Sequence, residues 1–129
     1  MNDFAMNLIS SYRASMFDGP AGIAWLRHGW RGLRQYGSQA KLALEKGDLV
    51  SKANVLAKAD QLLTFMEGIL DTSEGTTLGP ALLTIYSALR FTLLRANIEN
   101  DASALDDFEA ALMLLDQDVK KITEGVPVA

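Results

Sequence analysis

Few residues of this chain could do chemistry, and their spacing fits no common catalytic or metal site. The sequence contains one histidine, His28, and no cysteine, which excludes disulfides, cysteine nucleophiles and thiolate ligands. Carboxylates such as Asp60 and Glu67 stand alone, without the paired Glu-x-x-His motifs of four-helix carboxylate sites. Neither a Gly-x-x-x-x-Gly-Lys phosphate loop nor a Gly-x-Ser-x-Gly elbow occurs. We therefore expect no catalytic residue, no metal and no cofactor.

The best candidate for chemistry is the run His28-Gly29-Trp30-Arg31-Gly32. It resembles the His-x-x-Lys-Gly core of histidine phosphotransfer domains, which are themselves four-helix bundles of similar size. The resemblance implies that His28 accepts a phosphoryl group, that Arg31 steadies it one turn along, and that Gly32 clears the approach. Helical phase places His28 opposite the apolar side of its helix, which Ile23, Leu26 and Trp30 form, so we expect His28 to be accessible. Because five residues form a short motif, phosphotransfer through His28 is kept as an alternative function.

The composition is typical of one all-α domain spanning residues 1–129. Nearly half of the residues are apolar (49 %) and only three are proline, which favours an ordered helical globule. Lys and Arg number 12 against 16 Asp and Glu, and this net charge of −4 argues against a nucleic-acid partner. Without an apolar run of about 18 residues or a basic signal-like start, we expect no membrane anchor and a cytoplasmic location.

Apolar residues recur every three or four positions in four long segments, which predicts an antiparallel four-helix bundle over residues 20–123. The expected helices span 20–46, 48–71, 77–99 and 102–123. Gly47 is expected to close the first helix in the left-handed conformation, and Asp48 to cap the second. Residues 124–129 are predicted to be a flexible tail.

A short additional helix is expected within residues 1–15, ahead of the bundle. Phe4, Leu8 and Tyr12 fall on one side of it. A helix of this length does not persist in water unless it lies against something, so we expect it to dock.

Charge is distributed unevenly along the sequence. The first long helix carries basic residues with no acidic residue between them: Arg27, Arg31, Arg34 and Lys41. Acidic residues crowd the last helix: Asp106, Asp107, Glu109, Asp116 and Asp118. We interpret these as complementary solvated faces of one bundle.

The second and third long helices carry more apolar surface than a core needs. A bundle helix requires one apolar stripe, yet each of these has a second. The surplus side chains are Val55, Leu62, Phe65, Ile69, Leu83, Phe91, Leu94 and Ile98. Three covers are open: the N-terminal helix, a second copy in a homodimer, or an amphipathic partner helix that binds in a groove. The alternative is an irregular bundle in which one central helix is buried all round. Burying all eight would gain about 12 to 24 kcal/mol, enough for useful affinity after the costs of association and ordering.

The region around the third turn resembles the FliS family of flagellar secretion chaperones. The resemblance runs from about residue 25 to about residue 120, and its most specific part is an Ala-Asn-Ile-x-Asn-Asp run. The residues that carry it most clearly are Tyr86, Ala96, Asn97, Asn100 and Asp101.

The resemblance implies a cytoplasmic chaperone that binds the C-terminal helical segment of flagellin and prevents premature polymerisation. It also implies delivery of flagellin to the flagellar type III export gate. On this hypothesis the eight surplus side chains form the flagellin groove. We expect Phe4, Leu8 and Tyr12 to cover part of it when flagellin is absent.

Overall fold

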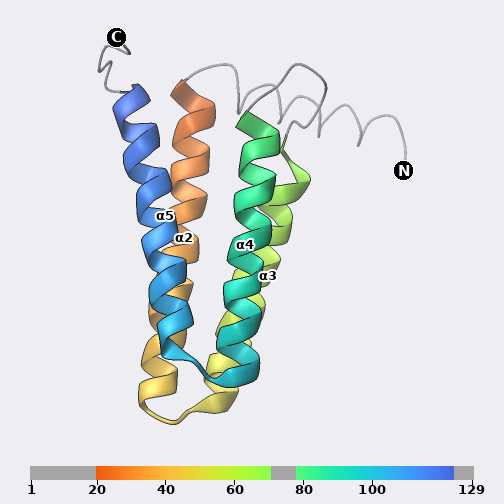
Figure 1. The fold of residues 1–129 in the computed structure, drawn as a ribbon, viewed down its shortest axis with the longest axis vertical. Helices are drawn as coiled ribbons and strands as arrows, with labels where there is room; N and C mark the ends of the chain where they lie inside the picture. Colours follow the sequence, from red (N-terminus) through yellow and green to blue (C-terminus); the bar gives the residue numbers. More distant parts are fainter. Residues whose placement is uncertain (1–19, 71–77, 124–129) are drawn as a thin grey trace.

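The computed structural model describes residues 20–70 and 78–123, and these form an all-helical bundle. Its helices are α2 (Pro20–Glu45), α3 (Leu49–Gly68), α4 (Leu78–Glu99) and α5 (Ala102–Thr123). Around the bundle α2 packs against α3 and α5, and α4 packs against the same two helices (Figure 1). The α2–α3 turn and the α4–α5 turn lie at the same end of the bundle (Figure 1).

The four helices predicted from periodicity are confirmed, with bounds that agree to within three residues. The predicted N-terminal helix with Phe4, Leu8 and Tyr12 lies outside the described residues, as does the predicted tail at 124–129.

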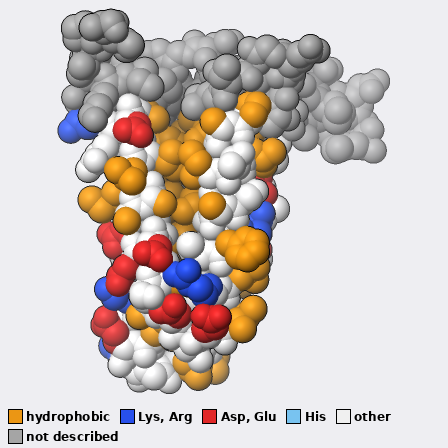
Figure 2. Space-filling view, viewed as in Figure 1, with side chains coloured by type: hydrophobic (Ala, Val, Ile, Leu, Met, Phe, Trp, Pro, Cys, Tyr) orange, Lys and Arg blue, Asp and Glu red, His pale blue; other side chains and the backbone are white. Residues whose placement is uncertain are grey.

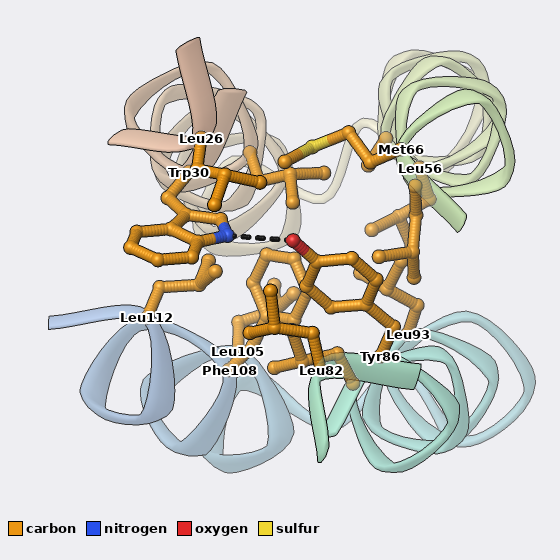
Figure 3. Packing of buried hydrophobic residues seen from close by; sticks show 14 of the residues in the cluster. Leu26, Trp30, Leu56, Met66, Leu82, Tyr86, Leu93, Leu105, Phe108 and Leu112 are labelled. Carbon is orange, nitrogen blue, oxygen red and sulfur yellow. Dashed lines mark hydrogen bonds between the residues drawn. The ribbon is translucent and has the colours of Figure 1, made fainter. Parts of the chain in front are cut away.

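Large apolar side chains from all four helices fill the centre of the bundle (Figure 3). Trp30 of α2 and Tyr86 of α4 are both fully buried, and the indole Nε1–H donates a hydrogen bond to the Tyr86 hydroxyl oxygen at 2.9 Å. Both polar groups lose their contact with water on burial. Without a hydrogen-bond partner each would lower the stability of the fold, and this bond avoids that loss. Burial also raises the pKa of Tyr86 to about 12, so its hydroxyl stays protonated at neutral pH.

Glycines let α2 approach its two neighbours closely. A Cβ atom at Gly37 would lie 3.2 Å from Phe108 Cδ1 of α5, and one at Gly32 would lie 3.2 Å from Leu62 Cδ2 of α3. At Gly29 a Cβ atom would lie 2.5 Å from Met66 Cε, so a larger residue there would push this side chain aside. Gly29, Gly32 and Gly37 are thus explained by helix packing.

The turn between α2 and α3 forms as its residues predict. Gly47 adopts a positive φ of 71°, and its N–H donates to the Leu44 carbonyl at 3.1 Å. The Asp48 N–H donates to the Ala43 carbonyl at 2.9 Å, which completes a Schellman motif. The Asp48 carboxylate then accepts from the Ser51 N–H at 3.1 Å and caps α3.

Ion pairs join α2 to α5, which confirms the complementary faces expected from the sequence. Arg27 Nε lies 2.8 Å from Asp116 Oδ1, and Lys41 Nζ lies 2.7 Å from Asp106 Oδ1. Arg34 and Glu109 form a longer pair at 3.8 Å. The hydrogen bond from Arg27, together with its positive charge, lowers the pKa of Asp116 below its usual value.

We predict that the Arg27–Asp116 pair makes the bundle sensitive to acid. Because the pKa of Asp116 is lower in the folded than in the unfolded chain, the pair's contribution is complete above the ordinary value of 3.8 and is lost as the pH falls through the lowered pKa. Between about pH 5 and about pH 3, Asp116→Asn should therefore lose less free energy of unfolding than the wild type. Urea denaturation at each pH measures this.

The matched control is Asp118→Asn on the same helix, because Asp118 is exposed and makes no ion pair with the described part of the chain. Its pH dependence should follow the wild type. Equal slopes for the wild type and Asp116→Asn would contradict the prediction.

Candidate functional site

The structure leaves five of the eight surplus apolar side chains on the surface: Phe65, Leu83, Phe91, Leu94 and Ile98. Phe91 and Ile98 are each 76 % exposed. The alternative in which α4 is buried all round is therefore wrong. Val55 and Leu62 are partly buried and pack against the core.

Ile69 was expected on the surface but lies in the core, 7 % exposed. The prediction extended the helix to residue 71, whereas α3 ends at Gly68 and Ile69 is its C-terminal cap. The rotation of about 100° per residue holds only inside a helix, so it does not place a residue at the helix end.

One apolar surface lies between α2 and α3, and we call it the α2–α3 pocket. Its volume is about 180 Å³. It is lined by Trp25, His28, Gly29, Gly32, Leu62, Phe65, Met66 and Ile69. Trp25 is 46 % exposed and Phe65 is 51 % exposed, so two aromatic rings border this hollow from facing helices. Sequence reasoning missed Trp25; the signal was an aromatic residue one turn before Gly29 on the same side of α2.

A second apolar surface follows the outside of α4, and we call it the α4 ridge: Leu83, Phe91, Leu94 and Ile98. Figure 2, which faces α4 and α5, shows apolar side chains along the α4 edge and charged side chains gathered toward the α4–α5 turn. Beside the ridge, a groove of about 200 Å³ runs between α3 and α4, with Ala53 and Ala57 on one side and Leu94 on the other.

A polar cluster centred on Arg90 ties α4 to α3. The guanidinium Nη1 donates to Glu67 Oε1 and Oε2 at 2.6 and 2.8 Å, and Nε donates to Asp60 Oδ1 at 3.0 Å. Nη2 donates to Thr64 Oγ1 at 2.8 Å. Asp60 and Glu67 are therefore paired and not isolated. Because this cluster occupies the α4 side of α3, the surplus residues form two surfaces, one on each side of α3, and not a single stripe.

The residues of the Ala-Asn-Ile-x-Asn-Asp run build the α4–α5 turn. Lys52 of α3 is buried, and its Nζ donates to the Asn97 carbonyl at 2.9 Å and to Asn100 Oδ1 at 2.7 Å. Asn100 adopts a positive φ of 51°, a conformation that asparagine tolerates better than most residues. Asp101 accepts from the Ser103 N–H at 2.9 Å and so caps α5.

Two other residues that carry the family resemblance face the interior. Ala96 and Tyr86 are fully buried, so they support the fold rather than a partner surface. The Lys52 contact was not predicted from the sequence. The available signal was a lysine in helical phase with the core residues Leu56 and Ala59.

His28 is exposed and lines the α2–α3 pocket. The glycines of its motif, Gly29 and Gly32, face Met66 and Leu62 in α3, which explains them by packing rather than by access to an incoming phosphoryl group. Within residues 20–70 and 78–123, no three His, Cys, Asp or Glu side chains gather into a metal site. No helix in this same part of the chain is both long and apolar enough to span a bilayer.

The chain is similar to known flagellar proteins. The model of a family described as flagellar protein FliS matches residues 29–124, a range that includes the α4 ridge, the α4–α5 turn and the α2–α3 pocket apart from Trp25 and His28. The flagellar secretion chaperone FliS of Salmonella typhimurium is 33 % identical over 86 residues. That alignment covers 66 % of this chain and 64 % of the relative, just under two thirds of the relative's length. Neither match is to a phosphotransfer domain, and nothing supports the alternative function through His28.

We predict that Lys52 stabilises the α4–α5 turn. Lys52→Met should lower the free energy of unfolding by about 1 to 3 kcal/mol, because two part-buried hydrogen bonds from a charged donor are lost. Thermal or urea denaturation measures the loss. The control Lys58→Met alters an exposed lysine of the same helix and should change stability by less than about 0.5 kcal/mol. Equal stabilities of the two variants would show that the Lys52 contacts contribute nothing.

Proposed function

The chain belongs to the flagellar protein FliS family, and on this basis we propose that it is a cytoplasmic chaperone for flagellin rather than an enzyme. It binds the C-terminal helical segment of flagellin, prevents premature polymerisation and delivers the subunit to the flagellar type III export apparatus. The name of the Salmonella relative, a flagellar secretion chaperone, supports a flagellar cargo.

The observation that carries this proposal is the exposed apolar area of the α4 ridge and the α2–α3 pocket. Phe91 and Ile98 expose most of their surface, and Phe65 about half. Contiguous exposed apolar side chains mark an interaction surface, and an amphipathic helix is the simplest element that covers a helical ridge or groove. A client that folds on binding supplies such helices.

The energetics favour a client that engages both surfaces. Burying the five exposed side chains at about 1.5 to 3 kcal/mol each gains about 8 to 15 kcal/mol. Association costs about 4 to 15 kcal/mol, and ordering a disordered segment costs about 2 to 5 kcal/mol. Because this balance is close to zero for the five alone, the client also needs Trp25 and the partly buried side chains of the α2–α3 pocket. The flagellin site of the proposal therefore comprises both surfaces.

We also propose the relative directions of the four helices. We take the helices to run antiparallel, because only Lys46 to Asp48 join α2 to α3 and only Asn100 and Asp101 join α4 to α5. A homodimer through the same apolar surfaces is the alternative cover.

We predict that substitutions on the α4 ridge weaken flagellin binding. The double variant Phe91→Asp with Ile98→Asp should bind a C-terminal flagellin fragment at least about tenfold more weakly, because each side chain contributes about 1.5 to 3 kcal/mol when buried. Isothermal titration calorimetry measures the affinity. The control is Leu114→Asp on α5, where Leu114 is 60 % exposed and lies outside both surfaces. Equal losses in both variants would remove the ridge from the binding site.

Co-expression with the same fragment, followed by size-exclusion chromatography, tests the function itself. A one-to-one complex is expected. A free chain that elutes unchanged, alone or as a homodimer, would contradict the chaperone function.

The N-terminal segment gives a separate prediction. If Phe4, Leu8 and Tyr12 cover part of the flagellin site, deleting residues 1–15 should tighten binding, because flagellin no longer has to displace them. The same calorimetric titration measures this. An affinity unchanged by the deletion would reject the covering role.

A further inference from the structure

We propose that α2 and α5 form a separate interaction site, which binds a carboxylate side chain of an acidic protein partner. The site is an open pocket of about 400 Å³ between these helices, and we call it the α2–α5 pocket. It is lined by Arg31, Arg34, Gln35, Ser38 and Glu109. It shares no residue with the α2–α3 pocket or the α4 ridge, so the proposal goes beyond the proposed flagellin site.

Ion pairs join α2 to α5 at three positions, and they leave one cation of α2 over. The three pairs are Arg27–Asp116, Arg34–Glu109 and Lys41–Asp106. Arg31 lies four residues after Arg27 and three before Arg34, on the same side of α2. It is exposed and makes no ion pair with the described part of the chain.

The residue of α5 at the corresponding position carries no charge. Met113 lies four residues after Glu109 and three before Asp116, so it shares their side of the helix. It is 40 % exposed. Where a carboxylate would complete the series of ion pairs, α5 therefore presents a thioether beside Arg31.

Arg34 also has hydrogen-bond donors that the described residues leave unused. Its Nη2 lies 3.8 Å from Glu109 Oε1, which is an ion pair but is longer than a hydrogen bond. Its Nε is buried and has no hydrogen-bond partner in the described part of the chain. The side chain as a whole is 33 % exposed, so an added acceptor can approach its terminal nitrogens.

The donors of the α2–α5 pocket suit carboxylate oxygens. Its four α2 residues follow one another at steps of three and four positions, which places them on one side of the helix. They offer two guanidinium groups, a side-chain amide and a hydroxyl, and all of these can donate hydrogen bonds to a carboxylate. Two guanidinium groups one turn apart can share one such ligand.

The charge of the site matches one carboxylate. Arg27, Arg31 and Arg34 carry three positive charges, and Asp116 and Glu109 carry two negative charges, so the net charge is +1 (3 − 2). A single carboxylate neutralises it. A phosphate group, with a charge of about −2, would leave the site negative.

A protein side chain fits this site better than a small free anion. Ion pairs at an exposed position contribute little by themselves, so a free carboxylate would bind weakly. A peptide segment can also bury apolar area against Met113 beside its carboxylate. Figure 3 shows α2 and α5 on one side of the bundle and α3 and α4 on the other. The site therefore stays accessible while a client covers the groove between α3 and α4.

The test titrates the full chain with two synthetic peptides that have blocked ends and carry either one glutamate or one glutamine between two leucines. NMR signals of the arginine Nε–H groups report binding. The glutamate peptide should bind about threefold to tenfold more tightly and should shift the Arg31 signal. The preference should shrink at about 0.5 M salt, because exposed charges are screened. Equal affinities would overturn the proposal, as would tighter binding of inorganic phosphate than of the glutamate peptide.

Two matched pairs of variants locate the effect. Arg31→Gln should remove the preference for the glutamate peptide, whereas Lys58→Gln, which removes an exposed cation from α3, should keep it. Met113→Glu supplies the missing carboxylate from α5, so it should remove the preference and raise the urea midpoint of unfolding. Met113→Gln, without the charge, should do neither. Equal effects within either pair would contradict the assigned site.

Flagellin binding separates this proposal from the proposed function. A C-terminal flagellin fragment should bind Arg31→Gln and Met113→Glu as tightly as it binds the wild type. If both variants lost affinity for the fragment as well as for the glutamate peptide, the carboxylate would belong to flagellin and the separate partner would be overturned. A fragment that does not bind, together with an intact preference for the glutamate peptide, would remove the proposed function and leave the α2–α5 pocket standing.

Discussion

A four-helix bundle has one interior, and each helix can turn only one face toward it. Here the interior is filled by large side chains around the hydrogen-bonded pair Trp30 and Tyr86. The apolar residues of α3 and α4 exceed what this interior accepts, so Phe65, Phe91 and Ile98 remain at the surface. Exposed apolar area of this kind costs solubility unless it is covered, and the proposed partner helix would cover it.

Ion pairs join neighbouring helices of the bundle. Acidic residues of α5 engage the basic face of α2, as in the Arg27–Asp116 pair, and the acidic residues of α3 engage Arg90. The Arg90 cluster separates the two apolar surfaces, which lie on opposite sides of α3. On the proposed function, a client that binds both surfaces must cross α3. Lys52 fixes its first turn to the end of α4.

Much of this arrangement follows from the sequence because helical periodicity and turn chemistry are local. Gly47 and Asp48 indicate the first turn, and the spacing of Phe91 and Ile98 places them away from the core, as the structure confirms. What could not be predicted depends on contacts between distant residues or on a helix end. The Arg90 cluster joins residues 23 to 30 positions apart, and the Lys52 contacts span 45 to 48 positions. The prediction that Ile69 is exposed is wrong because α3 ends at the residue before it. The Ala-Asn-Ile-x-Asn-Asp run indicated the family correctly, although Lys52, Asn100 and Asp101 show that it specifies a turn and not a binding surface.

The proposed function requires that the apolar side chains of α3 and α4 be exposed to solvent in the free chain and covered by flagellin in the complex. Hydroxyl-radical footprinting with mass spectrometry, on the chain alone and with a C-terminal flagellin fragment, measures this for each residue. Phe65, Phe91 and Ile98 should be oxidised readily in the free chain and protected in the complex, whereas buried Trp30 should be protected in both. If Phe91 and Ile98 were equally reactive with and without the fragment, or already protected in the free monomer, flagellin would not be the cover that this surface requires.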